Sequence, residues 1–332
     1  MKNKLLYKLR SGKNPKFIYY SVNALRLIIP KGIFRLRLQG RLSSLSRRKD
    51  KDYIERRVDY YNKLSGTVPL PSSAPRLSEH KMSKQKVYFF DTYQYTRWFS
   101  DQFQWGFCPG DVTFVPDRSM SMSPDYPSIV KSRPLTEDNA NSIVMKLDKV
   151  RHFIFVDDKK AFTEKKNMVI FRGKVKGKPS RKMFMEMYFH HPMCDLGDVS
   201  KNTTDPVEWR TEKKTINEHL DYKFIMALEG IDVASNLKWV MSSNSIAVMP
   251  RPTCETWFME GTLIPDYHYI EIKPDFSDLE ERLNYYIEHV DESLEIIRHA
   301  HEYVSQFKDK RRENLISLLV LDKYFKMTGQ KS

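Results

Sequence analysis

The sequence predicts an α/β fold of two Rossmann-like domains that face a cleft, preceded by a basic helical N-terminal extension. Short apolar runs alternate with helical stretches along most of the 332 residues, as in parallel sheets covered by helices. This alternation forms two successive series, and at about 150 residues per domain the chain is long enough for two domains. We therefore expect an extension and linker over 1–80, a first domain over 81–165, a second over 166–300 and C-terminal helices over 301–332.

The N-terminal 66 residues account for the net positive charge of the chain. They contain 18 Lys and Arg and four Asp and Glu, whereas the rest contains 38 of each sign. Apolar and aromatic residues are interleaved with these cations over 17–38, as in helices that lie on anionic membrane surfaces. The alternative is a solvated basic face whose apolar side packs on the body of the protein. Nucleic-acid binding is less favoured because no recognised nucleic-acid module accompanies the charge.

Several kinds of segment are not found in the sequence. No apolar run approaches the roughly 18 residues that span a bilayer, and no cleavable signal is evident. The three cysteines are widely separated and lack metal-ligand spacing, which argues against a disulfide framework or a zinc site. We therefore expect a cytoplasmic protein that binds peripherally at the inner face of a membrane.

The first series begins after a helical stretch over 48–63 and a Pro- and Ser-rich linker over 66–77. Aromatic and β-branched residues over 87–90 predict its first strand. A helix is expected over 93–107. Further along we expect strands over 112–115, 129–130 and 153–156, with a helix over 141–150.

The second series has clearer signals. Continuous apolar runs predict buried strands over 168–171, 224–228 and 246–249. Pro179 occupies a favoured first helical position and predicts a helix to Tyr188. Another helix is expected from Asp232 to about 241. Further helices are predicted over 277–289, 291–307 and 313–327.

Two loops that follow strands of the second series are predicted to bind an anion together. One offers guanidinium groups for phosphate, and the other offers backbone amides at the start of a helix. In an open parallel sheet both loops lie at the carboxyl edge, so a diphosphate is the expected ligand. A structural alternative is a salt bridge between Arg172 and Glu229, with the lysine-rich loop merely solvated. The candidate residues are Arg172, Gly173, Arg181, Gly230, Ser235, Asn236 and Lys238.

Three motifs in order make a specific resemblance. They are FRG at 171–173 with a basic residue downstream, LEGxxxASNLKxxxxSNS at 228–245, and HYIEIKPDFSDLEE at 268–281. This set resembles glycosyltransferase family 90, which includes protein O-glucosyltransferases, capsule-associated proteins and bacterial lipopolysaccharide glycosyltransferases. The similarity covers residues 85–290. The motifs GDVTFVPD, IVKSRP and KVRHFIFV are most similar to the bacterial lipopolysaccharide branch.

The resemblance implies a GT-B architecture with an acceptor-side first domain and a nucleotide-sugar second domain. It also implies an inverting glycosyltransferase without an essential metal or cofactor, using a nucleotide-sugar donor, expected to be a UDP-sugar, and a lipid-linked glycan acceptor. Arg172, Arg181 and Lys238 match the family motifs as diphosphate ligands. The eukaryotic branch has an arginine at the position of Asn236. A competing hypothesis is a non-catalytic protein that binds a membrane surface or nucleic acid through residues 1–66.

An inverting transferase also needs a base that takes the proton of the acceptor hydroxyl. Asp117, at the end of VTFVPD, best matches the family position, and Asp125 in PDYP is its rival. Glu255 and Glu260 follow the strand over 246–249, and either carboxylate is expected to bind the ribose hydroxyls of the donor. Lys131, Arg133, Arg151 and His152 are candidates for binding an anionic acceptor.

Overall fold

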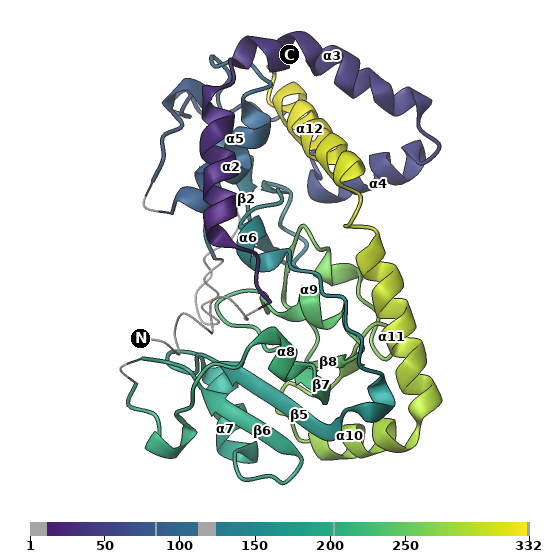
Figure 1. Ribbon diagram of the computed structural model, residues 1–332. Coiled ribbons are helices and arrows are strands. Elements are labelled where there is room, and N and C mark those ends of the chain that lie inside the picture. Colours follow the sequence, from purple (N-terminus) through teal and green to yellow (C-terminus); the bar gives the residue numbers. More distant parts are fainter. Residues whose placement is uncertain (1–11, 84, 112–123, 202, 331–332) are drawn as a thin grey trace. The chain divides into compact units, whose positions relative to one another are not determined.

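The computed structural model describes residues 12–83, 85–111, 124–201 and 203–330, which divide into two compact units (Figure 1). The five-stranded unit comprises Met1–Asn14, Arg151–Pro252 and Gly261–Gln306. The helical unit comprises Pro15–Val150, Thr253–Glu260 and Phe307–Ser332. This division differs from the expected boundaries, because most of the expected extension and the last helix belong to the same unit as 81–150.

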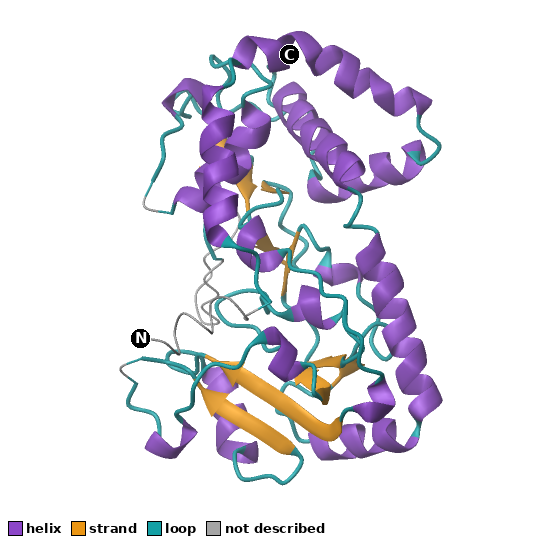
Figure 2. Ribbon diagram, viewed as in Figure 1, coloured by secondary structure: helices purple, strands orange, loops and turns teal. Residues whose placement is uncertain are grey.

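A parallel sheet forms the centre of the five-stranded unit (Figure 2). Its strands run in the order β10-β8-β7-β5-β6, and every neighbouring pair is parallel. Each residue of β7 and β8 is buried, which explains why these segments read as continuous apolar runs. The bounds are β5 (Lys166–Gly173), β6 (Cys194–Asp198), β7 (Tyr222–Met226), β8 (Ile246–Met249) and β10 (Ile270–Glu271).

The helices of this unit mostly match the prediction. Pro179 opens α7 as expected. The expected helix from Asp232 to 241 is wrong, because only the single turn α9 forms and the residues before it make irregular turns. The helices are α7 (Pro179–Tyr188), α8 (Ile216–His219), α9 (Leu237–Val240), α10 (Leu279–Glu288) and α11 (Val290–Ser305), with 3₁₀ turns η3 (Phe162–Glu164) and η4 (Val207–Trp209).

The helical unit is built mainly from helices far apart in sequence. Pro30 separates α2 from α3, and Asp309 caps α12 by accepting from the amides of Arg311 and Arg312 at 2.9 and 3.1 Å. None of the described helices has the length and apolarity needed to cross a membrane. The elements are α2 (Lys16–Ile28), α3 (Lys31–Ser43), η1 (Ser44–Arg47), α4 (Lys51–Tyr61), η2 (Leu77–Glu79), α5 (Lys86–Thr96) and α12 (Lys310–Met327).

Two small sheets complete the helical unit. The strands β1 (Gly106–Cys108), β2 (Ser128–Val130) and β4 (Ser142–Val144) are parallel in the order β1-β2-β4. The strand β3 (Ser132–Pro134) pairs antiparallel with β9 (Cys254–Thr256). In sequence, α6 (Lys149–His152) and η5 (Glu260–Thr262) each contain a boundary between the units.

Four sequence predictions for the first series are wrong. The expected helix over 93–107 ends with α5 at Thr96, and β1 begins at Gly106. The expected strand over 87–90 lies within α5, whose residues are buried on most sides, so the helical period is lost from the sequence. The expected helix over 141–150 begins instead with β4, where buried Ile143 and Val144 pair with β2. Residues 153–156 form no strand. The expected strand over 112–115 lies outside the described residues.

Candidate functional site

Arg181 lies in the first turn of α7 and joins two loops at the carboxyl edge of the five-stranded sheet. Its Nη1 donates to the carbonyl oxygen of Lys174 at 3.0 Å, in the loop after β5. Its Nη2 and Nε donate to the carbonyls of Leu228 and Glu229 at 2.7 and 3.0 Å, in the segment after β7. Because β5 and β7 are neighbours in the sheet, one side chain holds both predicted anion-binding loops together.

Among the described residues, no acid neutralises the charge of this guanidinium. Within the part of the chain that the structure describes, no carboxylate lies within ion-pair distance of Arg181, and its recorded partners are carbonyl oxygens. Burial lowers the pKa of Arg181 to about 10, so the group still carries a full charge at neutral pH. Arg181 is half-buried; a cation that is partly removed from water and lacks a counter-charge is costly, and a bound anion would offset that cost.

Two glycines allow the loops to approach the guanidinium. A Cβ at Gly173 would lie 2.5 Å from Cζ of Phe171 and 3.3 Å from Nη1 of Arg181. A Cβ at Gly230 would lie 3.2 Å from Nη2 of Arg181 and 3.4 Å from Cε of Lys178. Gly173, Lys178, Arg181 and Gly230 therefore form one group, which we call the Arg181 cluster.

Lys178 is the member of this cluster that sequence reasoning missed. It is the residue before the first turn of α7 and is half-buried. Pro179 was the sequence signal that could have identified Lys178. Proline is favoured at the first helical position, so the residue before it is expected directly at the start of the helix.

Arg172 lies beside this cluster in sequence but has its own partner. Its guanidinium forms an ion pair with Asp195 on β6 and donates to the Asp195 carbonyl at 2.7 Å. Asp195 also accepts from the hydroxyl of Tyr222. Burial alone would raise the pKa of Asp195, but hydrogen bonds from Tyr222 and Arg172 outweigh it and lower the pKa. The expected alternative salt bridge of Arg172 with Glu229 is replaced by this pair.

The residues expected at the start of the helix after β7 differ in exposure and in their contacts. Ser235 is exposed. Asn236 donates from Nδ2 to the carbonyl of Met226 at 2.9 Å and so holds the end of β7. Lys238 is fully buried, with 0% exposure. Because α9 is a single turn, the helix-dipole argument for an anion here loses its support.

Glu255 and Arg133, expected to serve the donor and the acceptor respectively, form one buried ion pair in the helical unit. Nε of Arg133 lies 2.7 Å from Oε1 of Glu255, and the two side chains are 0% and 1% exposed. Glu255 also accepts from the hydroxyl of Tyr60. In this structure Glu255 thus belongs with β3 and β9, not with the five-stranded unit.

The other acceptor candidates have protein partners as well. Lys131, 1% exposed, forms an ion pair with Asp111. Nη2 of Arg151 lies 2.9 Å from Nε2 of the buried His152. Of the two candidate bases, Asp117 lies outside the described residues, and Asp125 is exposed three residues before β2.

Comparison with known proteins identifies relatives of the chain. Residues 139–329 match the family model described as Glycosyl transferase family 90. The chain is also 38% identical over 275 residues to O-glucosyltransferase LpsA of Dichelobacter nodosus, a match that covers 82% of this chain and 83% of that protein.

Proposed function

The chain belongs to glycosyl transferase family 90 and is a glycosyltransferase, and from this premise we propose that it transfers glucose from UDP-glucose to a hydroxyl of a lipopolysaccharide acceptor. The name of the relative, O-glucosyltransferase LpsA, supports glucose as the sugar and lipopolysaccharide as the acceptor class. Family membership decides against the hypothesis of a non-catalytic binding protein. The structural observation that carries the proposal is the half-buried guanidinium of Arg181, which has no acidic partner among the described residues, at the carboxyl edge of a parallel sheet.

In the proposed reaction, an aspartate takes the proton of the acceptor hydroxyl and the oxygen attacks the anomeric carbon of glucose. The bond between that carbon and the diphosphate oxygen breaks, its electron pair leaves with UDP, and the configuration inverts. Negative charge grows on the diphosphate as this bond breaks. Arg181, with Lys178 nearby, would stabilise that charge in place of a metal ion. Arg172 and Asp195 would hold the end of β5 that carries Gly173.

The test of this proposal is a screen of nucleotide sugars with the full-length protein. We expect UDP-glucose to be hydrolysed slowly without acceptor and rapidly consumed with a lipopolysaccharide acceptor, and we expect UDP to raise the melting temperature. Another nucleotide sugar consumed in preference to UDP-glucose would overturn the donor assignment. No shift with any nucleoside diphosphate would overturn the diphosphate site.

The base is tested by comparing Asp117→Asn with Asp125→Asn. General-base catalysis contributes about 10²–10⁴-fold, so Asp117→Asn is expected to lower kcat for transfer by at least about 100-fold. Donor binding should stay unchanged, because amide and carboxylate have the same shape. Asp125→Asn, an exposed position, serves as the matched control and should remain active. The opposite pattern would reassign the base to Asp125.

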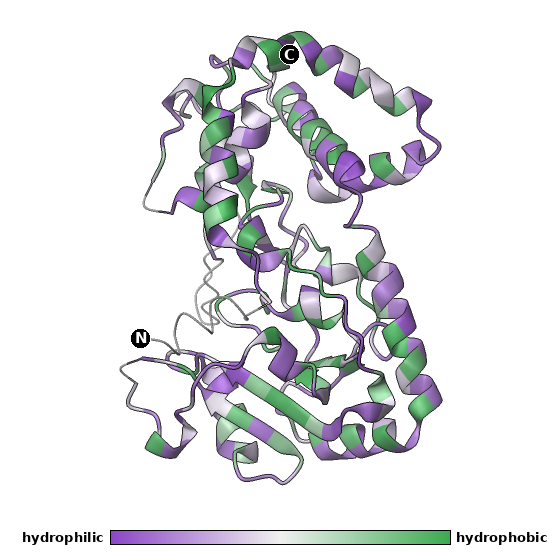
Figure 3. Cartoon of the chain, in the orientation of Figure 1, coloured by the Kyte–Doolittle hydropathy of each residue, from purple (hydrophilic) through white to green (hydrophobic). Residues whose placement is uncertain are grey.

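We also propose that the helical unit binds the surface of an anionic membrane, where its lipid-linked acceptor would be found. Figure 3 shows hydrophobic and hydrophilic residues mixed along α2 and α3. Phe17 is 82% exposed, and Leu25, Ile28 and Leu36 are also largely exposed. Exposed apolar side chains among lysines and arginines are typical of helices that lie in the membrane interface.

A further inference from the structure

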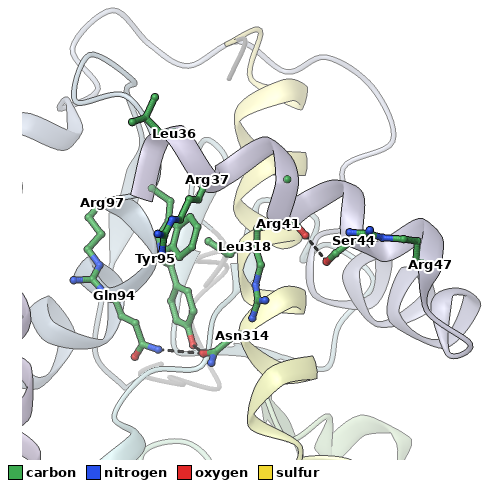
Figure 4. Close-up of a pocket in the computed structure, with 12 residues that line it drawn as sticks. Leu36, Arg37, Arg41, Ser44, Arg47, Gln94, Tyr95, Arg97, Asn314 and Leu318 are labelled. Carbon is green, nitrogen blue, oxygen red and sulfur yellow. Dashed lines mark hydrogen bonds between the residues drawn. The ribbon is translucent and has the colours of Figure 1, made fainter. Parts of the chain in front are cut away.

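A groove in the helical unit contains none of the residues considered so far for the reaction. It has a volume of about 740 Å³ and lies between α3, η1, the end of α5 and α12 (Figure 4). Its lining includes four arginines, Arg37, Arg41, Arg47 and Arg97, and no acidic residue.

The arginines from α3 and η1 have no counter-charge of their own. Arg37, Arg41 and Arg47 are exposed, and over the described ranges no carboxylate or other hydrogen-bond acceptor is recorded for their guanidinium groups. Arg37 and Arg41 are four residues apart and so share one face of the helix, where like charges repel. An anion in the groove would remove this repulsion.

Arg97 forms a buried wall of the groove. It is 7% exposed, and its guanidinium lies over the ring of Phe34 at 3.7 Å from the centroid. Nη1 donates to the carbonyl of Arg26 at 3.0 Å, while Nε is buried without a hydrogen-bond partner among the described residues. A buried cation with an unused donor adds to the attraction for an anion.

The side-chain acceptors of Asn314 and Gln94 on the floor of the groove are already engaged. The Oδ1 atom of Asn314 accepts from Nε2 of Gln94 at 3.1 Å and from the hydroxyl of Tyr95 at 2.9 Å. The Oε1 atom of Gln94 accepts from Nζ of Lys149 at 3.0 Å. Both acceptor atoms are thus occupied by protein donors. A ligand with several acceptor oxygens, such as a phosphate, suits this lining.

Apolar residues on the same helices indicate where such a phosphate would come from. Leu36, which lines the groove, is 87% exposed. Ile33 on the same helix and Ile28 at the end of α2 are also exposed. Cations flanked by exposed apolar side chains fit a phosphate at a lipid–water interface better than a freely dissolved one.

We propose that the groove binds the phosphate headgroup of an anionic membrane lipid through Arg37, Arg41, Arg47 and Arg97. This deepens the proposed membrane association and does not depend on the donor assignment. The groove would place α3 against the lipid surface by a specific contact in addition to general charge attraction.

The experiment compares vesicle binding of full-length variants with equal charge. The groove variant carries Arg37→Ala and Arg41→Ala. The control carries Lys49→Ala and Arg56→Ala, which are exposed and outside the groove. Vesicles of phosphatidylcholine with phosphatidylglycerol are the probe, and vesicles of phosphatidylcholine alone are the reference. We expect the groove variant to lose at least about tenfold more affinity than the control, since each lost hydrogen bond to a charged phosphate accounts for about tenfold.

Three outcomes would overturn the proposal. Equal losses in the two variants would show general charge attraction only. Tighter binding of soluble glucose 6-phosphate than of the vesicles would assign the groove to a phosphorylated glycan instead. Loss of UDP-glucose hydrolysis in the groove variant, with an unchanged melting temperature, would place the groove in the reaction. If the protein hydrolyses no nucleotide sugar but the vesicle result holds, the donor proposal fails and the groove assignment stands.

Discussion

Replacing Arg181 with alanine is expected to lower kcat/KM for UDP-glucose by at least about 100-fold, the loss typical of removing one donor that stabilises developing negative charge. The expectation follows from the position of the guanidinium, which is half-buried at the carboxyl edge of the sheet without an acidic partner in the described structure. Steady-state hydrolysis or transfer kinetics measure the effect. Lys182→Ala is the matched control, because Lys182 is the next residue on α7 but is exposed and pairs with Glu186 at 3.8 Å.

Arg181 also holds two loops by hydrogen bonds to their carbonyls, so its loss could act through the fold. Arg181→Lys separates the two roles: it keeps the positive charge, but its single nitrogen lacks the planar fork whose three nitrogens reach carbonyls on both loops. A melting temperature recorded for each variant reports the structural contribution. Near-normal kinetics in Arg181→Ala with an intact fold would contradict the assignment of Arg181 to the diphosphate.

Replacing Glu313 with alanine is expected to destabilise the helical unit by about 3–5 kcal/mol, the cost of removing one partner from a buried ion pair. Glu313 accepts hydrogen bonds from Arg57 at 2.6 Å, from Lys146 at 2.9 Å and from the indole of Trp257 at 2.7 Å. The Arg57 and Glu313 side chains are only 3% and 5% exposed. The substitution would leave two cations without this partner inside the protein. Urea unfolding followed by tryptophan fluorescence measures the change.

Glu55→Ala is the matched control for this stability prediction. Glu55 is a half-exposed partner of Lys51 at 3.7 Å, and surface pairs contribute about 0–1 kcal/mol. Burial would raise the pKa of Glu313, but Lys146 and Arg57 outweigh it and the pKa is lowered. The stabilisation is therefore present at neutral pH and is lost as the pH falls through this lowered pKa. A loss in Glu313→Ala no larger than in Glu55→Ala would contradict the account.

The sequence predicted the second series of elements better than the first. The strands β7 and β8 are buried along their whole length and β5 is buried at residues 169–171, so their apolar runs were clear in the sequence, and Pro179 marked the start of α7. In contrast, α5 is buried on most sides, so its sequence does not show the helical spacing of apolar and polar residues. The strand β4 has only three residues. Short elements whose position depends on distant partners leave no local signal.

The candidate site was predicted in part for similar reasons. Arg181, Gly173 and Gly230 come together because they follow neighbouring strands of one sheet, which the alternation of elements indicates. Pairing between distant residues could not be read from the sequence. Glu255 forms an ion pair with Arg133, which lies 122 positions away in the sequence. Arg172 forms an ion pair with Asp195 on the adjacent strand and not with Glu229.

The proposed function depends on binding of the donor diphosphate by the Arg181 cluster without a metal ion. Calorimetric titration of UDP into the wild-type protein, Arg181→Ala and Lys182→Ala, each with and without EDTA, tests this binding most directly. We expect the wild-type protein and Lys182→Ala to bind UDP equally, and Arg181→Ala to bind at least about tenfold more weakly, the loss of one hydrogen bond to a charged group. UDP binding that disappears with EDTA, or that is the same in all three proteins, would contradict the proposed binding.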